Sequence, residues 1–153
     1  MRLESSIVIR RKTDAVCRFL ADPLNVPKWD RGVAAVEVIG EGNPQGIGCE
    51  FATLGYGTSL PDRGRMDYRV TEAESDGRKS CVELISRTGN ARYFRAARWR
   101  QRVEDALEGS RVTVVAEFRL RPRYFFLAPV LRILGPSALR RDMLSLKHSL
   151  EQA

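Results

Sequence analysis

The feature that most constrains this chain is a change in hydrophobic period close to residue 125. Before it, apolar and polar side chains alternate over short stretches, which is the period of β-strands that bury one face. After it, apolar residues recur three, four and seven positions apart, as in an amphipathic helix. The helical positions are Leu127, Val130, Leu131, Leu134, Leu139, Met143, Leu146 and Leu150. An apolar sheet face and a long apolar helix face shield each other best when the sheet curls around the helix.

The alternating part of the chain predicts seven strands joined by links of hairpin length. The strands are expected at residues 3–11, 33–39, 48–54, 63–74, 80–87, 91–103 and 111–121. Turn-rich sequence separates them at residues 40–46, 55–61, 75–78, 88–90 and 108–110. Consecutive hairpins form an antiparallel meander, so the expected class is α+β with one curved antiparallel sheet. A length of 153 residues fits a single domain, residues 1–153, with one core.

Helices are expected at two places. Two short helices follow the first strand. Thr13 is the expected N-cap of the first, which ends at Asp22-Pro23. The second is expected at residues 24–29, and Pro27 limits it to a turn or two. The long C-terminal helix is expected over residues 125–150, with a kink at Gly135-Pro136.

The formal net charge is +7, and arginine supplies most of the basic charge because the chain has only four lysines. A charge of this sign suits nucleic acid, anionic lipid or an anionic ligand. The basic residues are scattered singly along alternating strands, which favours a solvated surface over a nucleic-acid site.

Cys17, Cys49 and Cys81 are far apart, odd in number and without a CxxC pair, so they are interpreted as small buried hydrophobes. With His148 as the only histidine, no metal site is expected. The N-terminus lacks the apolar core of a signal peptide, and no run of about 18 apolar residues occurs. We therefore expect a cytoplasmic protein without stable membrane insertion.

Several short sequence patterns follow one another over nearly the whole chain. Trp29-Asp30 follows the second short helix, and the other patterns are residues 6–9, 13–22, 46–48, 68–72, 108–114 and 146–151. Together they resemble the polyketide cyclase/dehydrase and lipid-transport family of the SRPBCC, START-like (Bet v 1-like) superfamily. The resemblance implies a helix-grip fold, in which a sheet of about seven strands wraps a long C-terminal helix.

The resemblance also implies a deep cavity between the sheet and the C-terminal helix. In the family this cavity takes lipids, hormones, polyketides or other apolar molecules, and most members need neither metal nor cofactor. Some bacterial members are aromatase/cyclases that use tyrosine and arginine inside the cavity. Trp99 is similar to a position lining the cavity of such cyclases, whereas Val36 stands at the position that resembles their catalytic tyrosine.

The expected ligand-binding residues have apolar side chains on the inward faces of the predicted elements. They are Trp29, Phe51, Met66, Tyr68, Trp99, Val114, Phe118, Leu131 and Met143. Tyr68, Gln101 and Arg95 are the candidate catalytic residues, since tyrosine donates hydrogen bonds to carbonyls and arginine pairs with enolates or carboxylates. Strict alternation turns Arg95 inward, but a bulge near Asn90 would turn it outward.

Two further segments leave alternatives open. Arg65, Asp67 and Arg69 are expected on the solvent face, because three charges in an apolar cavity would be costly, although similarity to the cyclases would turn Arg69 inward. Residues 124–127 are a ligand gate, a membrane-touching patch beside Arg121 and Arg123, or a helix start packed on the sheet edge.

Three functions follow from these patterns. The first is a carrier that binds a hydrophobic small molecule, as a monomer or homodimer. The second is a cyclase or dehydratase that acts on a polyketide-like substrate in the same cavity. The third, nucleic-acid binding through the arginines, predicts an affinity that falls steeply with salt, and we expect no nucleic-acid partner.

Overall fold

A computed structural model describes residues 1–40, 46–56, 63–85 and 93–152 of the chain. Within these ranges the chain forms strands, two α-helices and two short 3-10 helices. In chain order the elements are β1 Arg2–Ile9, α1 Thr13–Ala21, η1 Pro23–Lys28, β2 Ala35–Ile39, β3 Glu50–Leu54, β4 Met66–Ala73, β5 Lys79–Leu84, β6 Phe94–Ala106, β7 Gly109–Leu120, η2 Pro122–Leu127 and α2 Ala128–Glu151.

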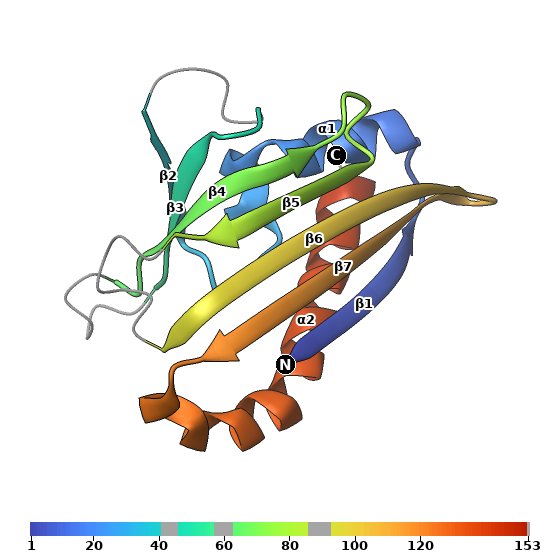
Figure 1. Cartoon of the computed structure of the whole chain (residues 1–153). Helices are drawn as coiled ribbons and strands as arrows, with labels where there is room; N and C mark the ends of the chain where they lie inside the picture. Colours follow the sequence, from blue (N-terminus) through green and yellow to red (C-terminus); the bar gives the residue numbers. More distant parts are fainter. Residues whose placement is uncertain (41–45, 57–62, 86–92, 153) are drawn as a thin grey trace.

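The strands form one seven-stranded antiparallel sheet in the order β1-β7-β6-β5-β4-β3-β2. Strands β2 to β7 follow one another as a meander, and β1 returns to pair with β7. Helices α1 and α2 lie on the same face of the sheet, α1 behind β4 and β5 and α2 behind β6 and β7 (Figure 1). This arrangement confirms the expected α+β class and the helix-grip architecture.

The filled core lies between α2 and the β1–β7–β6 side of the sheet. On β7 the side chains of Val112, Val114 and Ala116 are fully buried, as the alternation along this strand predicts. On α2 the matching helical positions are Leu139, Met143, Leu146 and Leu150, all at most 4% exposed. Full burial of each such side chain contributes about 1.5–3 kcal/mol, so this cluster anchors α2 to the sheet.

Two glycine-containing turns fix the ends of the hairpins. Gly109 opens β7 with a φ of +146°, and a Cβ there would lie 2.3 Å from the Ile9 carbonyl oxygen. In the predicted turn at residues 75–78, the Gly77 N–H donates to the Glu74 carbonyl at 2.9 Å, and Gly77 has a φ of +74°. A Cβ on Gly77 would lie 3.1 Å from the Cys17 Cβ, so this turn packs directly against α1. The expected turn at 88–90 lies outside the described residues, as do residues 41–45 of the turn at 40–46 and residues 57–61 of the turn at 55–61.

The beginnings of the helices differ from expectation. Lys12, not Thr13, is the N-cap of α1, and the Thr13 hydroxyl donates instead to Asp105 at 2.5 Å. Before η1, the Asp22 carboxylate caps the helix by accepting from the Leu24 N–H at 3.0 Å. The C-terminal helix starts at Ala128, three residues later than expected.

The chain preceding α2 forms the 3-10 helix η2, which is kinked inside at Tyr124, where φ is −113° and ψ is 15°. Helix α2 continues through Pro136. The ribbon crosses the bottom of Figure 1 and then turns upward behind the sheet, so the C-terminal helical segment changes direction along its length.

The outer face of the sheet carries paired charges. Arg65 bonds Glu37 at 2.8 Å and Asp67 at 2.9 Å, and Arg69 pairs with Glu50 at 3.3 Å. Arg69 therefore points away from the helices, as the alternation predicts. Asp67 differs from the expected solvent-exposed residue: it is only 5% exposed, because Arg65 and the neighbouring strands cover it.

Candidate functional site

A cavity of about 880 Å³ lies between the β3–β6 side of the sheet and the short helices α1 and η1. Its size falls in the range of about 300–1,000 Å³ that is usual for small-molecule sites. None of its described lining residues belongs to α2. The expected position, between the sheet and the C-terminal helix, is therefore corrected: α2 fills one side of the sheet and leaves the other side hollow.

Aromatic rings form one wall of the cavity. Phe51 on β3 and Tyr68 on β4 are paired across the two strands, and their rings stack with centroids 5.7 Å apart and an interplanar angle of 29°. Trp99 on β6 and Met66 on β4 also line the cavity. This wall offers a large, weakly polar surface of the kind that binds flat apolar molecules.

Two tryptophans separate the cavity from the filled core. Trp29, 5% exposed, belongs to the core cluster around α2 and also lines the cavity. Trp99 packs against that cluster and against the second cluster of buried residues around Phe51 and Tyr68. Both tryptophans therefore pack against the core and line the cavity with the same side chain.

Tyr68 is the most deeply buried polar group of the wall. It is 6% exposed, and its hydroxyl donates to the Met66 sulfur at 3.7 Å. Burial raises the pKa of Tyr68 well above its ordinary value; a hydrogen bond with the Trp99 side chain lowers it, and the charge of Asp30 raises it further. The hydroxyl is therefore protonated throughout the neutral range and can donate a hydrogen bond to a ligand.

Asp30 adds a carboxylate to the cavity wall directly after Trp29. Its Oδ1 accepts from the Gly32 N–H at 2.9 Å, and burial raises the pKa of Asp30 although this hydrogen bond opposes the rise. On α2, burial and then the charge of Asp30 raise the pKa of Asp142 to about 6, while a hydrogen bond from the Arg31 N–H opposes them. These two carboxyl groups therefore interact, and Asp142 takes up its proton at a higher pH than an ordinary aspartate does.

Gln101 on β6 and Ser80 on β5 form a second polar point of the wall. The two residues are paired across the strands, and the Ser80 hydroxyl donates to the Gln101 Oε1 at 3.4 Å. Within the described residues the Gln101 amide N–H₂ donates no hydrogen bond, and Gln101 lines the cavity. It can therefore donate to an oxygen of a bound molecule.

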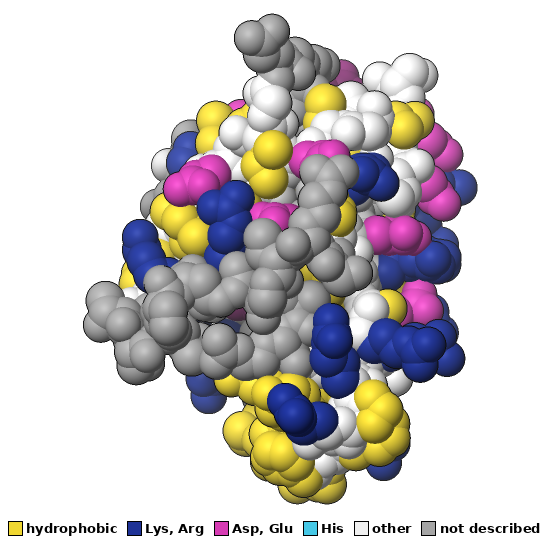
Figure 2. Space-filling model, turned by 60° about the vertical axis from the view of Figure 1, so that its left-hand side comes forward, with side chains coloured by type: hydrophobic (Ala, Val, Ile, Leu, Met, Phe, Trp, Pro, Cys, Tyr) yellow, Lys and Arg dark blue, Asp and Glu magenta, His cyan; other side chains and the backbone are white. Residues whose placement is uncertain are grey.

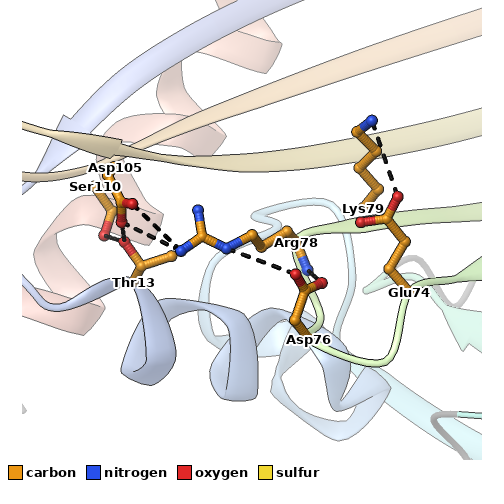
Figure 3. A network of polar contacts seen from close by, with 7 residues as sticks. All are labelled: Thr13, Glu74, Asp76, Arg78, Lys79, Asp105 and Ser110. Atoms are coloured by element: carbon orange, nitrogen blue, oxygen red, sulfur yellow. Dashed lines mark hydrogen bonds and ion pairs between the residues drawn. The ribbon is translucent and has the colours of Figure 1, made fainter.

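Charged residues border the cavity beside α1 and the β4–β5 turn. Glu74, Asp76 and Lys79 line it, and Figure 3 shows how Arg78 links this turn to the β6–β7 hairpin. Arg78 bonds Asp76 at 3.7 Å and Asp105 at 3.3 Å. The Thr13 hydroxyl on α1 donates a hydrogen bond to Asp105 and completes the link (Figure 3). The network ties α1 to two turns and so holds this side of the cavity in place.

The structure brings together only some of the residues predicted to bind the ligand. Those that line the cavity are Trp29, Phe51, Met66, Tyr68, Trp99 and Gln101. Val114 and Met143 instead lie in the filled core, at 0% and 1% exposure. Leu131 lies on α2 outside the cavity, and Phe118 stands behind Trp99 with the ring centroids 5.5 Å apart. None of these four residues lines the cavity.

Arg95 is exposed and does not line the cavity. The strand register shifts between Phe94 and Ala96, where β6 pairs with β7, so the alternation breaks at this residue. The structure therefore adopts the alternative in which a bulge turns Arg95 outward, although the bulge lies at residues 94–96 and not near Asn90, which is outside the described residues.

Several lining residues were not predicted. Cys17 and Leu20 come from α1, Val70 and Val82 from β4 and β5, and Asp30 from the loop after η1. Burial raises the pKa of the Cys17 thiol, which keeps it protonated and weakly nucleophilic. The Trp29-Asp30 pair and the apolar face of residues 15–20 were visible in the sequence, but their orientation toward the hollow side of the sheet was not.

The described residues hold no cluster of three or more histidine, cysteine, aspartate or glutamate side chains that could ligate a metal ion. In the same part of the chain, no helix has the length and apolarity needed to cross a bilayer.

The curved sheet, the helices on its inner face and the cavity beneath them define a helix-grip domain with the architecture of a small-molecule binding protein. The chain belongs to the family described as polyketide cyclase / dehydrase and lipid transport, whose model matches residues 1–151. A search of curated proteins by sequence gave no match.

Solved structures share the fold at low sequence identity. A START superfamily protein from Mycobacterium smegmatis is 10% identical with a TM-score of 0.75, and covers 99% of this chain and 97% of that one. Ara h 8.0201 is 12% identical with a TM-score of 0.72, covering 100% and 99%. The di-domain ARO/CYC BexL of the BE-7585A biosynthetic pathway is 17% identical with a TM-score of 0.70; the match covers 99% of this chain but only 46% of BexL.

Proposed function

We propose that this protein binds a flat or elongated apolar small molecule, lipid- or polyketide-like, in the cavity between β3–β6 and the short helices. The observation that carries the proposal is a space of about 880 Å³ with aromatic and aliphatic walls. Tyr68, Gln101 and Asp30 bring a few polar groups to these walls, which suits a ligand with one or two oxygens. Family membership supports the same function.

Identification of a co-purifying molecule tests this proposal. The purified protein is analysed by native mass spectrometry and, after solvent extraction, by liquid chromatography with mass spectrometry. We expect a stoichiometric apolar compound whose loss on mild organic washing lowers the melting temperature, because a ligand that binds only the folded state stabilises it. If washed and unwashed protein have the same mass and melting temperature at every purification scale, and added apolar compounds leave both unchanged, the proposal is wrong.

A second, catalytic use of the same cavity is favoured because Tyr68, Trp99 and Asp30 line it together and the charge of Asp30 acts on the Tyr68 hydroxyl. In a cyclisation of a poly-β-ketone, the Asp30 carboxylate would accept a proton from a methylene between two carbonyls, and Tyr68 would donate a hydrogen bond to the carbonyl under attack. Arg95 takes no part, because it points outward. A linear poly-β-ketone thioester mimic is the test substrate: Asp30→Asn should abolish formation of cyclised, dehydrated product and retain binding of the mimic. Equal product with both proteins refutes the catalytic use.

Nucleic-acid binding through the arginines is not supported by the surface of the sheet. Arg98 pairs with Glu83 at 2.7 Å, and Arg100 lies 3.8 Å from Glu117, so carboxylates neutralise much of the positive charge there. A cytoplasmic location and a monomeric or homodimeric state stay predictions of the sequence.

A further inference from the structure

One end of the molecule exposes an unusual number of large apolar side chains. Figure 2 shows hydrophobic side chains gathered at the lower end, where Figure 1 places η2 and the start of α2. We call this group the apolar patch, and its members with their exposed fractions are Phe125 (60%), Phe126 (70%), Val130 (50%), Ile133 (74%) and Leu134 (61%). Isolated exposed apolar residues are ordinary, but a contiguous group marks an interaction surface.

The apolar patch is not the unpacked edge of the core. Val130, Ile133 and Leu134 have the i, i+3, i+4 spacing of one helix face. The opposite face packs on the sheet: a Cβ on Gly135 would lie 2.8 Å from a methyl carbon of Leu3 on β1. Of residues 124–127, Tyr124 packs against Tyr93 with centroids 4.9 Å apart, while both phenylalanines face outward. A helix start packed on the sheet edge, one of the three alternatives for this segment, therefore does not account for its phenylalanines.

The charges around the apolar patch have one sign. Residues 118–141 contain six arginines and neither aspartate nor glutamate. Arg123 precedes Phe125, and the neighbouring residues Arg140 and Arg141 follow Leu134 about two turns further along α2. All three arginines are exposed. None of these three forms an ion pair with a carboxylate of the described residues, in contrast to the arginines on the outer face of the sheet.

We propose that the apolar patch and its flanking arginines dock this protein onto the surface of an anionic phospholipid bilayer. The aromatic and aliphatic side chains would enter the boundary between headgroups and acyl chains, and the arginines would contact lipid phosphates. The lack of acidic residues favours lipid over a second copy of the chain, since face-to-face pairing of two copies would bring the arginines together. Docking of this kind is peripheral and independent of whether the cavity binds a ligand.

Vesicle co-sedimentation tests the proposal. The full chain is mixed with vesicles of phosphatidylcholine alone or with 30 mol% phosphatidylglycerol, at several salt concentrations. We expect binding to the anionic vesicles, weakened by salt, and at least tenfold weaker binding to phosphatidylcholine. Arg123→Gln/Arg141→Gln should weaken anionic binding about 25-fold, since each basic residue near such a surface contributes about fivefold. Phe126→Ser/Ile133→Ser should weaken it at least tenfold.

Matched controls use residues of the same types far from the apolar patch. Leu107 is fully exposed at the tip of the β6–β7 hairpin, and Arg111 is exposed on β7. Leu107→Ser and Arg111→Gln should each retain binding within twofold, and circular dichroism should show every variant folded. Two results overturn the proposal: equal affinity for both vesicle types, or unchanged affinity in both patch variants. A dimer in sedimentation velocity that Phe126→Ser/Ile133→Ser dissociates, with no vesicle binding, would assign the patch to self-association and overturn it as well.

Discussion

The interaction between Asp142 and Asp30 predicts a substitution that stabilises the protein. Asp142→Asn removes a charge that is held beside another carboxylate and partly shielded from water. The amide retains an oxygen that can accept from the Arg31 N–H, which lies 3.1 Å from Asp142 Oδ1. At pH 7.5 the substitution should therefore raise the free energy of unfolding.

The magnitude follows from the pKa of Asp142, which burial and then the charge of Asp30 raise from an ordinary value of 3.8 to about 6. At about 1.4 kcal/mol per pKa unit this rise corresponds to about 3 kcal/mol. Asp142 is only half-buried, so solvent screening reduces the expected gain to about 1–1.5 kcal/mol. For a chain of this length the melting temperature should rise by about 3–5 °C.

The pH dependence gives the sign of the effect independently. Because the folded state holds the Asp142 proton more tightly than the unfolded state, the contribution of Asp142 to stability is greatest below pH 3.8 and is lost as pH rises through about 6. The gain from Asp142→Asn should therefore be full at pH 7.5 and vanish near pH 3.5. Urea unfolding of the wild type, Asp142→Asn and the control Glu108→Gln, at both pH values, measures this. A destabilised Asp142→Asn at pH 7.5, or a gain of equal size at both pH values, would refute the reasoning.

Three further substitutions test the fold by urea unfolding. Leu146→Ala, in the fully buried core, should cost about 2–5 kcal/mol; a loss below 1 kcal/mol would contradict the packing described for α2. Gly109→Ala should destabilise by about 2 kcal/mol or more, because its Cβ would meet the Ile9 carbonyl; a neutral effect would argue against this close approach. Thr13→Val breaks the hydrogen bond to Asp105 and should cost about 1–3 kcal/mol, whereas unchanged stability would show that the bond contributes nothing.

Much of the fold could be predicted because its determinants are local periodicities. The alternation of Val112, Val114 and Ala116 marks the buried face of β7. The spacing of Leu139, Met143 and Leu146 marks the face of α2 that packs on the sheet. Each pattern repeats over several residues, so a single irregularity does not hide it.

The position of the cavity could not be predicted from the same patterns. Val114 and Tyr68 both lie on inward faces, yet one is in the filled core and the other lines the cavity. The difference depends on which part of the sheet α2 covers, and this is set by long-range contacts such as those of Leu3 with Gly135. Periodicity identifies a buried face but does not say whether a helix or a hollow lies opposite.

Two features that depend on single residues also differ from the sequence-based expectation. The bulge at residues 94–96 turns the Arg95 side chain to the other face of the sheet. No turn-forming residue at these positions indicates the bulge. Thr13 is a residue type that often caps the N-terminus of a helix, but its hydroxyl donates to Asp105, which is distant in the sequence. For Thr13, a contact between α1 and β6, which are far apart in the sequence, overrides a local preference.

The measurement that tests the account most directly is titration of N-phenyl-1-naphthylamine, an uncharged fluorophore that brightens in apolar surroundings. Val70 and Val82 face each other across β4 and β5 and both line the cavity, whereas Val38 lies on the edge strand β2 outside it. The wild type, the control Val38→Trp and the patch variant Phe126→Ser/Ile133→Ser should bind the fluorophore alike. Val70→Trp/Val82→Trp should bind it at least tenfold more weakly while staying folded. Unchanged affinity in that folded double variant would contradict an apolar binding cavity at this place.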